Sequence, residues 1–233
     1  ALFCDTTALR EQVVDDVIMS AFRSAGQRCS ALRVLFLPDE TADETIEMIK
    51  GAMDVMIIGD PADPSTDVGP IIDAEARGLL ETHLMKMKPI ARVWQRDIGA
   101  LHAKGTFFGP AIVELDGLDQ IDREVFGPIL HVIRYDPDDI EKVGGALSAK
   151  GYGLTLGVHS RLEGFAEKST TNLLDSRLGR AIRIARPVAR RRCAGRRARG
   201  DAGDPAAGLR DEQLAGGARR RCRSSRRLGL GRW

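Results

Sequence analysis

The sequence predicts an α/β fold for residues 1–170, with an open, mainly parallel sheet and flanking helices. Two observations support this fold class. Segments with apolar residues at three- and four-residue spacing, typical of helices, alternate with short apolar runs that are typical of strands. These runs are apolar at consecutive positions, which indicates strands that are buried on both faces, as in parallel sheets.

The first predicted elements are a strand, a helix and a second strand. The apolar run Ala1–Asp5 predicts a short strand, and Leu9–Phe22 carries apolar residues along one helix face. Gly26 is expected to end this helix, because glycine adopts the conformations that terminate helices without strain. Leu32–Leu37 predicts a strand that is buried on both sides and stopped by Pro38.

The middle of the chain predicts two more helices. Ala42–Met56 has one apolar face, whose methionines we interpret as core residues. A segment rich in Pro, Asp and Ser follows, with the composition of turns. The second helix is expected at Ala74–Met87, and Ala91–Trp94 is a candidate strand.

The last predicted elements precede a segment of different character. A strand at Ile129–Tyr135, a helix around Asp139–Ala149 and a loop and strand at Gly151–Ser160 continue the alternation. Residues 171–233 contain 18 Arg, no Lys and 5 Asp or Glu, a net charge of +13, whereas residues 1–170 carry −11. High charge with little apolar periodicity predicts a disordered, arginine-rich, low-complexity tail over 171–233.

Composition argues against several classes of protein. The cysteines form no Cys-x-x-Cys pair and the histidines lack metal-ligand spacing, so we expect neither a metal nor a disulfide framework. No apolar run reaches the length of about 18 residues that spans a bilayer, and no signal-peptide pattern is present. A reducing, cytoplasmic location fits best. The cysteines are Cys4, Cys29, Cys193 and Cys222, and the histidines are His83, His102, His131 and His159.

The segment Ser24–Ser30, here called the Cys29 loop, is the strongest candidate for chemistry. A cysteine between a helix and a strand is well placed to act as a nucleophile, and Arg28 and backbone N–H groups would favour its thiolate. The alternative is that Cys29 is a small buried apolar residue, which is the commoner role of free cysteine.

Two motifs favour the nucleophile. Gly26-Gln27-Arg28-Cys29-Ser30 resembles the nucleophile loop of the aldehyde dehydrogenase superfamily. Glu124-Val125-Phe126-Gly127-Pro128, here called the Glu124 loop, resembles the second signature of that superfamily. The resemblance implies that Cys29 attacks the carbonyl of an aldehyde. It also implies NAD as cofactor, with the Glu124 carboxylate holding the nicotinamide ribose and the Phe126 ring packing near the nicotinamide.

Three longer stretches narrow the resemblance. Ser24–Arg33, Thr66–Asp73 and Tyr152–Arg161 resemble the Δ1-pyrroline-5-carboxylate dehydrogenases, most closely those fused to proline dehydrogenase in bacterial proline utilisation A proteins. This implies NAD-dependent oxidation of L-glutamate γ-semialdehyde to L-glutamate in proline catabolism. It also implies that Ser30 helps to hold the substrate carboxylate. Members of the family oligomerise through a flap, which is not recognisable in this sequence.

The departures from the family pattern predict an incomplete site. The family's dinucleotide-binding domain, general-base glutamate and oxyanion-hole asparagine precede the region that matches this sequence. We therefore expect a catalytic-domain portion, a fragment that is inactive alone. A reading-frame change in GC-rich DNA would account for the arginine-rich tail.

A second hypothesis is a non-catalytic remnant whose tail binds polyanions or nucleic acid through its arginines. Trp233 is the tail's only aromatic residue, so we expect no specific recognition of nucleic acid.

Overall fold

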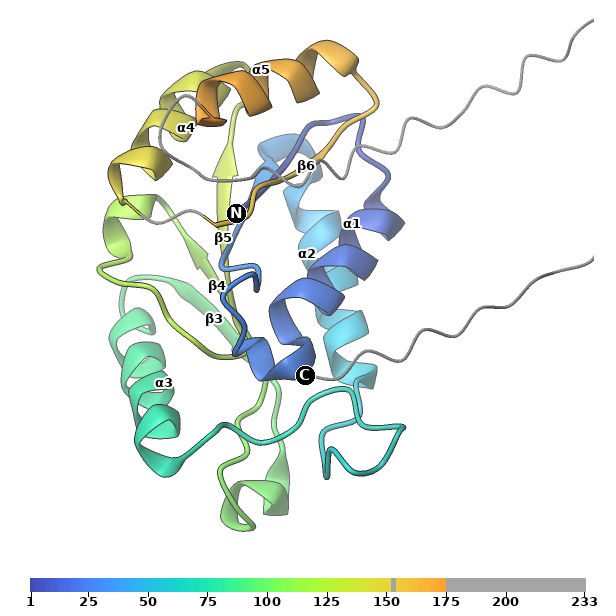
Figure 1. The fold of residues 1–233 in the computed structure, drawn as a ribbon, viewed down its shortest axis with the longest axis vertical. Helices are drawn as coiled ribbons and strands as arrows, with labels where there is room; N and C mark the ends of the chain where they lie inside the picture. The colour runs from blue at the N-terminus through green and yellow to red at the C-terminus, as the bar shows by residue number, and fades with distance from the viewer. Residues whose placement is uncertain (152–153, 175–233) are drawn as a thin grey trace, which may run out of the picture. The chain divides into compact units, whose positions relative to one another are not determined.

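The computed structural model describes residues 1–151 and 154–174 of the chain, and Figure 1 shows their arrangement. One mixed sheet has the strand order β3-β4-β5-β2-β1-β6. All neighbouring pairs are parallel except β3 and β4, which are antiparallel. The predicted fold class, an open and mainly parallel α/β sheet, is therefore confirmed. The strands are β1 (Leu2–Cys4), β2 (Val34–Pro38), β3 (Arg92–Gln95), β4 (Ala111–Leu115), β5 (Ile129–Tyr135) and β6 (Gly157–His159).

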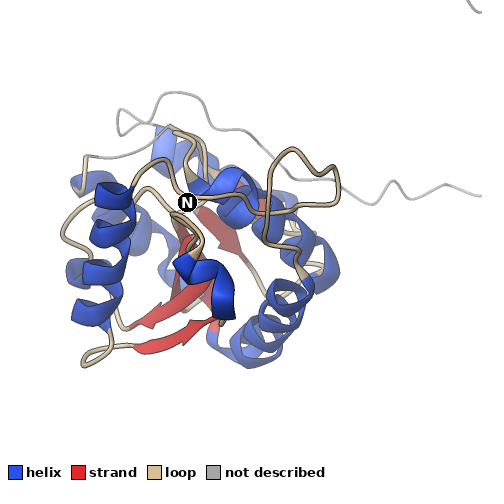
Figure 2. Cartoon of the chain, turned by 90° about the horizontal axis from the view of Figure 1, so that it is seen from below, coloured by secondary structure: helices blue, strands red, loops and turns tan. Residues whose placement is uncertain are grey.

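Helices flank the sheet on both sides, as Figures 1 and 2 show. The first two lie on one face, and the third and fourth lie on the other. Among the described residues, no helix is both long enough and apolar enough to cross a bilayer. The α-helices are α1 (Arg10–Val17), α2 (Asp39–Val55), α3 (Ala74–Met87), α4 (Ile140–Ala149) and α5 (Glu163–Leu174).

The centre of the sheet is the centre of the core. All five residues of β2 are buried, as expected for a strand with neighbours on both edges and helices on both faces. The Phe3 ring stacks on Phe36 with centroids 4.3 Å apart, and the Tyr135 ring meets both edge-on. The Tyr135 hydroxyl donates a 2.7 Å hydrogen bond to the Cys4 carbonyl, so the one polar atom of this cluster is paired.

The first helix differs from its prediction at the C-terminal end. Regular α-helix stops at Val17, and a π turn (Ile18–Phe22) and a 3-10 turn (Arg23–Gly26) follow. Three consecutive residues of the second turn, Ser24, Ala25 and Gly26, have φ values of 56°, 51° and 60°. The helical segment ends at Gly26, as predicted, but regular α-helix stops nine residues earlier and the chain leaves the helix gradually.

Two other boundaries move for local reasons. β2 begins at Val34, two residues later than predicted, which leaves Arg33 outside the strand. α2 begins directly after Pro38, because the proline φ of −59° suits a helix entry and two acidic residues follow in the first turn.

The C-terminal helix α5 was not predicted, and it packs against α4. The predicted domain boundary at residue 170 falls inside this helix. Tyr152, Gly153 and the predicted tail beyond residue 174 lie outside the described residues, so the division of the chain at 170 stays a prediction.

Candidate active site

The Cys29 loop begins within the strained 3-10 turn, leads toward β2 and carries an exposed cysteine. Positive φ values at Ser24 and Ala25 are uncommon for residues other than glycine, and such conformations concentrate at functional sites. Cys29 is exposed, which excludes the alternative of a small buried core residue, and its role as a nucleophile stays a prediction.

The Glu124 loop lies directly against the Cys29 loop, although about 100 residues separate them along the chain. A Cβ atom on Gly26 would lie 2.1 Å from the backbone oxygen of Gly127, far inside contact distance. A Cβ atom on Gly127 would in turn lie 2.5 Å from the Leu80 side chain of α3. Two glycines therefore allow the two motifs and α3 to approach this closely.

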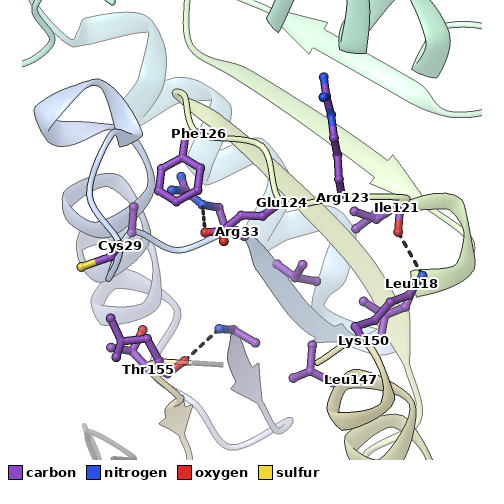
Figure 3. Close-up of a pocket in the computed structure, with 14 residues that line it drawn as sticks. Cys29, Arg33, Leu118, Ile121, Arg123, Glu124, Phe126, Leu147, Lys150 and Thr155 are labelled. Carbon is purple, nitrogen blue, oxygen red and sulfur yellow. Dashed lines mark hydrogen bonds and ion pairs between the residues drawn. The ribbon is translucent and has the colours of Figure 1, made fainter. Parts of the chain in front are cut away.

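Both motifs line one cavity of about 230 Å³, shown in Figure 3. Cys29, Glu124 and Phe126 all contribute to its wall. Ser30 is exposed and is not part of the lining, so its predicted role in holding a substrate carboxylate stays a prediction. The remaining lining residues are Ala1, Ala31, Arg33, Val34, Leu118, Ile121, Arg123, Leu147, Lys150, Leu154 and Thr155.

Arg33 joins the two motifs and was missed in the sequence. Its Nε donates to Glu124 Oε1 at 3.2 Å, and its guanidinium lies 4.5 Å from the centre of the Phe126 ring. The same group donates to two carbonyls of the Cys29 loop, from Nη1 to Gly26 at 2.6 Å and from Nη2 to Arg28 at 3.0 Å. Figure 3 shows Arg33 between the Phe126 ring and Glu124.

The charge of Arg33 is coupled to Glu124 and to Cys29. Burial lowers the pKa of Arg33, while the hydrogen bond and charge of Glu124, and then the charge of Cys29, act in the opposite direction. Arg28, which the sequence suggested as the cation that favours the Cys29 thiolate, donates from Nη2 to the Met19 carbonyl at 3.4 Å, and that role stays a prediction. A charged residue next to the apolar run of β2 was the signal that could have identified Arg33.

The segment Thr66–Asp73, one of the three stretches that narrow the family resemblance, supports the Cys29 loop. The Gln27 amide nitrogen donates to the Pro70 carbonyl at 3.3 Å, and its oxygen accepts from the Ile72 N–H at 2.9 Å. One side chain thus satisfies a donor and an acceptor of the segment, which ties the residues before Cys29 to the residues before α3.

Cys29 is expected to react with iodoacetamide much faster than Cys4. Cys4 is 2% exposed in β1, and burial followed by the nearby Asp5 charge raises the pKa of its thiol, which disfavours the reactive thiolate. Mass spectrometry of a Cys193→Ser, Cys222→Ser chain at neutral pH measures both rates. Equal rates would contradict the assignment of Cys29 as the available thiol, and a rate for Cys29 above that of an unfolded control would show activation.

A histidine pair lies next to Arg33, with His131 buried and His83 half-buried. His131 on β5 is 2% exposed, and its Nδ1 is 3.1 Å from the Arg33 carbonyl, to which it donates when it carries the proton. Its Nε2 then accepts from His83 Nε2 on α3, 2.9 Å away. This arrangement requires a neutral His131, because a second proton on its ring would leave two N–H groups facing each other.

The fold is expected to lose up to about 3 kcal/mol of stability as the pH falls from 6.5 to 4. Burial, then the adjacent His83, lowers the pKa of His131 to about 4. Between this pKa and the unfolded value the unfolded chain binds more protons, so the free energy of unfolding falls with decreasing pH. Urea denaturation at a series of pH values measures the slope.

The pH series needs two variants, because other groups titrate in the same window. Burial, then the charges of Arg123 and Lys86, lower the pKa of His83, whereas Asp122 raises it, and the charge of Arg33 adds to the lowering of the His131 pKa. His131→Leu should flatten the slope, whereas His102→Gln should not, since that side chain is 57% exposed. An unchanged slope in His131→Leu would contradict the assignment.

Two groups on the cavity wall have the chemistry that a ribose and a planar ring require. The Glu124 carboxylate has about four acceptor positions, so its bond to Arg33 leaves capacity for ribose hydroxyls. The Phe126 ring is 47% exposed and offers an apolar surface to a planar ring. Among the described residues, no group of three or more His, Cys, Asp or Glu side chains could hold a metal ion.

Comparison with known proteins identifies the family. The family model described as "Aldehyde dehydrogenase family" matches residues 2–178. The Bifunctional protein PutA of Klebsiella aerogenes is 47% identical over 169 residues, which cover 70% of this chain and 13% of PutA. The N-succinylglutamate 5-semialdehyde dehydrogenase of Novosphingobium aromaticivorans is 37% identical over 126 residues, or 53% of this chain and 26% of that protein.

A solved structure agrees with the sequence matches. The crystal structure of a Bradyrhizobium japonicum proline utilization A variant superposes with a TM-score of 0.71 and 46% identity, covering 79% of this chain and 18% of that one. The chain thus spans a small part of the PutA proteins that it resembles. Because the family model matches well over half of its residues, this chain belongs to the aldehyde dehydrogenase family.

Proposed function

We propose that this chain contributes the nucleophile and the nicotinamide-ribose contact to the NAD-dependent oxidation of L-glutamate γ-semialdehyde to L-glutamate. The observation that carries the proposal is that Cys29, Glu124 and Phe126 line one cavity and are linked there by Arg33. The identity to PutA and to an N-succinylglutamate 5-semialdehyde dehydrogenase supports a substrate that carries a glutamate semialdehyde group.

Cys29 performs the covalent step. Its thiolate sulfur forms a bond to the aldehyde carbon, and the electron pair of the C=O bond moves onto the oxygen, which gives a thiohemiacetal. Cys29 is exposed on the cavity wall, so a small aldehyde reaches it without displacing core residues.

Glu124 and Phe126 orient the cofactor. The carboxylate accepts hydrogen bonds from ribose hydroxyls, and Arg33 fixes its direction by holding Oε1. The exposed Phe126 ring limits the positions of the nicotinamide beside Cys29. When bound, NAD supplies the acceptor for the hydride that leaves during oxidation to the acid.

A chimera tests the proposal in a complete enzyme. Residues 2–168 of this chain replace the matching segment of the Klebsiella aerogenes PutA, which is 47% identical to this chain over 169 residues. The chimera is incubated with L-glutamate γ-semialdehyde and NAD, and NADH absorbance is followed, with unmodified PutA as reference. We expect sustained NADH formation. A chimera that folds by circular dichroism but forms no NADH would contradict the proposal.

A further inference from the structure

We propose that Arg33 is a positioning residue that locks the Cys29 loop to the Glu124 loop, so that nucleophile and cofactor contact are held as one unit. The catalytic consequence of this lock rests on the proposed function, whereas the lock itself is a property of the folded chain. Arg33 touches neither the reacting sulfur nor a ligand in any described contact, and it acts through its neighbours.

The geometry of the guanidinium carries the inference. Each of its three nitrogens has a different acceptor: Nε reaches the Glu124 carboxylate, Nη1 the Gly26 carbonyl and Nη2 the Arg28 carbonyl. One planar face also lies against the Phe126 ring, 4.5 Å from its centre. The side chain is only 14% exposed, so these bonds are partly shielded from water.

The acceptors lie in the same two loops as the catalytic candidates. The carbonyls of Gly26 and Arg28 belong to the Cys29 loop on either side of Gln27, and Glu124 and Phe126 belong to the facing loop. The Cys29 loop has strained backbone angles, which persist only when surrounding contacts fix them. Arg33 supplies two such contacts, and it directly precedes β2, which is buried in the centre of the sheet.

Lysine cannot reproduce this arrangement. An ammonium group is a compact point charge on a flexible stem, and it lacks the planar fork that reaches three separate acceptors. A purely electrostatic role would tolerate Arg33→Lys, whereas a positioning role would not. The conservative variant therefore separates the two roles.

Hydrogen exchange in the full chain tests the lock. The N–H groups of Gln27 and Ala31 are bonded to the Ser24 and Arg28 carbonyls and report opening of the Cys29 loop. We expect Arg33→Gln to speed their exchange by about tenfold or more, since bonds to a charged group are lost. Arg33→Lys should fail to restore protection.

Coupling across the two loops is the decisive measurement. Glu124→Gln alone should speed exchange of these Cys29-loop amides, because it weakens the anchor of Arg33 on the other side. In the Arg33→Gln background the same substitution should add no further effect. If Arg33 did not couple the two loops, Arg33→Gln and Glu124→Gln would each change the exchange rates by an independent factor, and the two factors would multiply in the double variant. Such independence, or full protection in Arg33→Lys, would overturn the proposal.

Arg134→Gln is the matched control. Arg134 likewise joins two segments, through the carboxylates of Glu114 at 2.6 Å and Asp43 at 2.5 Å, and its side chain is 26% exposed. Arg134→Gln should change the exchange rates of the Gln27 and Ala31 amides by no more than its effect on global stability accounts for. An equal effect of Arg134→Gln on these amides would also overturn the proposal. If Arg33→Gln does not fold, Arg33→Lys and the Glu124→Gln, Arg33→Lys pair give the same comparison. Exchange needs no turnover, so its outcome is independent of whether the chimera oxidises an aldehyde.

Discussion

Replacing Cys29 with alanine in the PutA chimera is expected to lower NADH formation by about 10³-fold or more. Removal of a covalent nucleophile takes away the step on which the rest of the mechanism depends, and effects of this size or larger are typical. Among the described residues that line the cavity with Glu124, Cys29 is the only cysteine. Initial rates at saturating aldehyde and NAD measure the loss.

Cys4→Ala is the control for this experiment. Cys4 is buried in β1 and lines no part of the cavity that holds Glu124, so its replacement should leave the rate within about twofold. A Cys29→Ala chimera that retains the parent rate would show that another group attacks the aldehyde. Loss of rate in both variants would point to a folding defect and not to a missing nucleophile.

Elements with strong local signals were predicted closely. α3 has the predicted bounds, Ala74–Met87, and the Asp73 carboxylate caps it by accepting from the Ala76 N–H at 2.7 Å. β5 also has the predicted bounds, Ile129–Tyr135, because a long apolar run is bounded by Pro128 and Asp136. Such signals lie within a few residues of the element that they define.

Features that depend on distant contacts were not predicted. The strand order places β1 between β2 and β6, a pairing across more than 150 residues that no local pattern encodes. The π turn after Val17 was also missed. There the Ser20 carbonyl accepts from the Leu32 N–H at 3.1 Å, a contact outside the helix pattern. Helix periodicity continues through Phe22 although the regular helix does not.

The candidate site likewise combines residues that the sequence suggested with one, Arg33, that it did not. Spacing alone could not bring Cys29 and Glu124 together, and the family resemblance suggested them as a pair. The structure places both on one cavity wall. Arg33 was overlooked because its partner Glu124 lies 91 positions away and its sequence context is an apolar strand. A charge beside a buried strand is costly unless it is paired, which is the physical reason to examine such a residue.

Replacing Gly26 with alanine is expected to destabilise the fold by about 2 to 5 kcal/mol. The φ of +60° costs an L-residue about 1 to 2 kcal/mol, and the added methyl group would lie 2.1 Å from the Gly127 oxygen and 2.8 Å from the Ala21 oxygen. Both are backbone atoms, so relief requires the two loops to separate. Urea denaturation and the midpoint of thermal unfolding measure the loss.

The control for Gly26→Ala is Gly78→Ala in the middle of α3. A Cβ atom there meets nothing within 4 Å, and alanine favours a helix by up to about 1 kcal/mol over glycine, so this variant should be neutral or more stable. Gly26→Ala should also speed alkylation of Cys4, because a less stable fold exposes β1 more often. If Gly26→Ala is as stable as Gly78→Ala, the contact between the Cys29 loop and the Glu124 loop is not as close as the structure shows, and the lock by Arg33 loses its geometric basis.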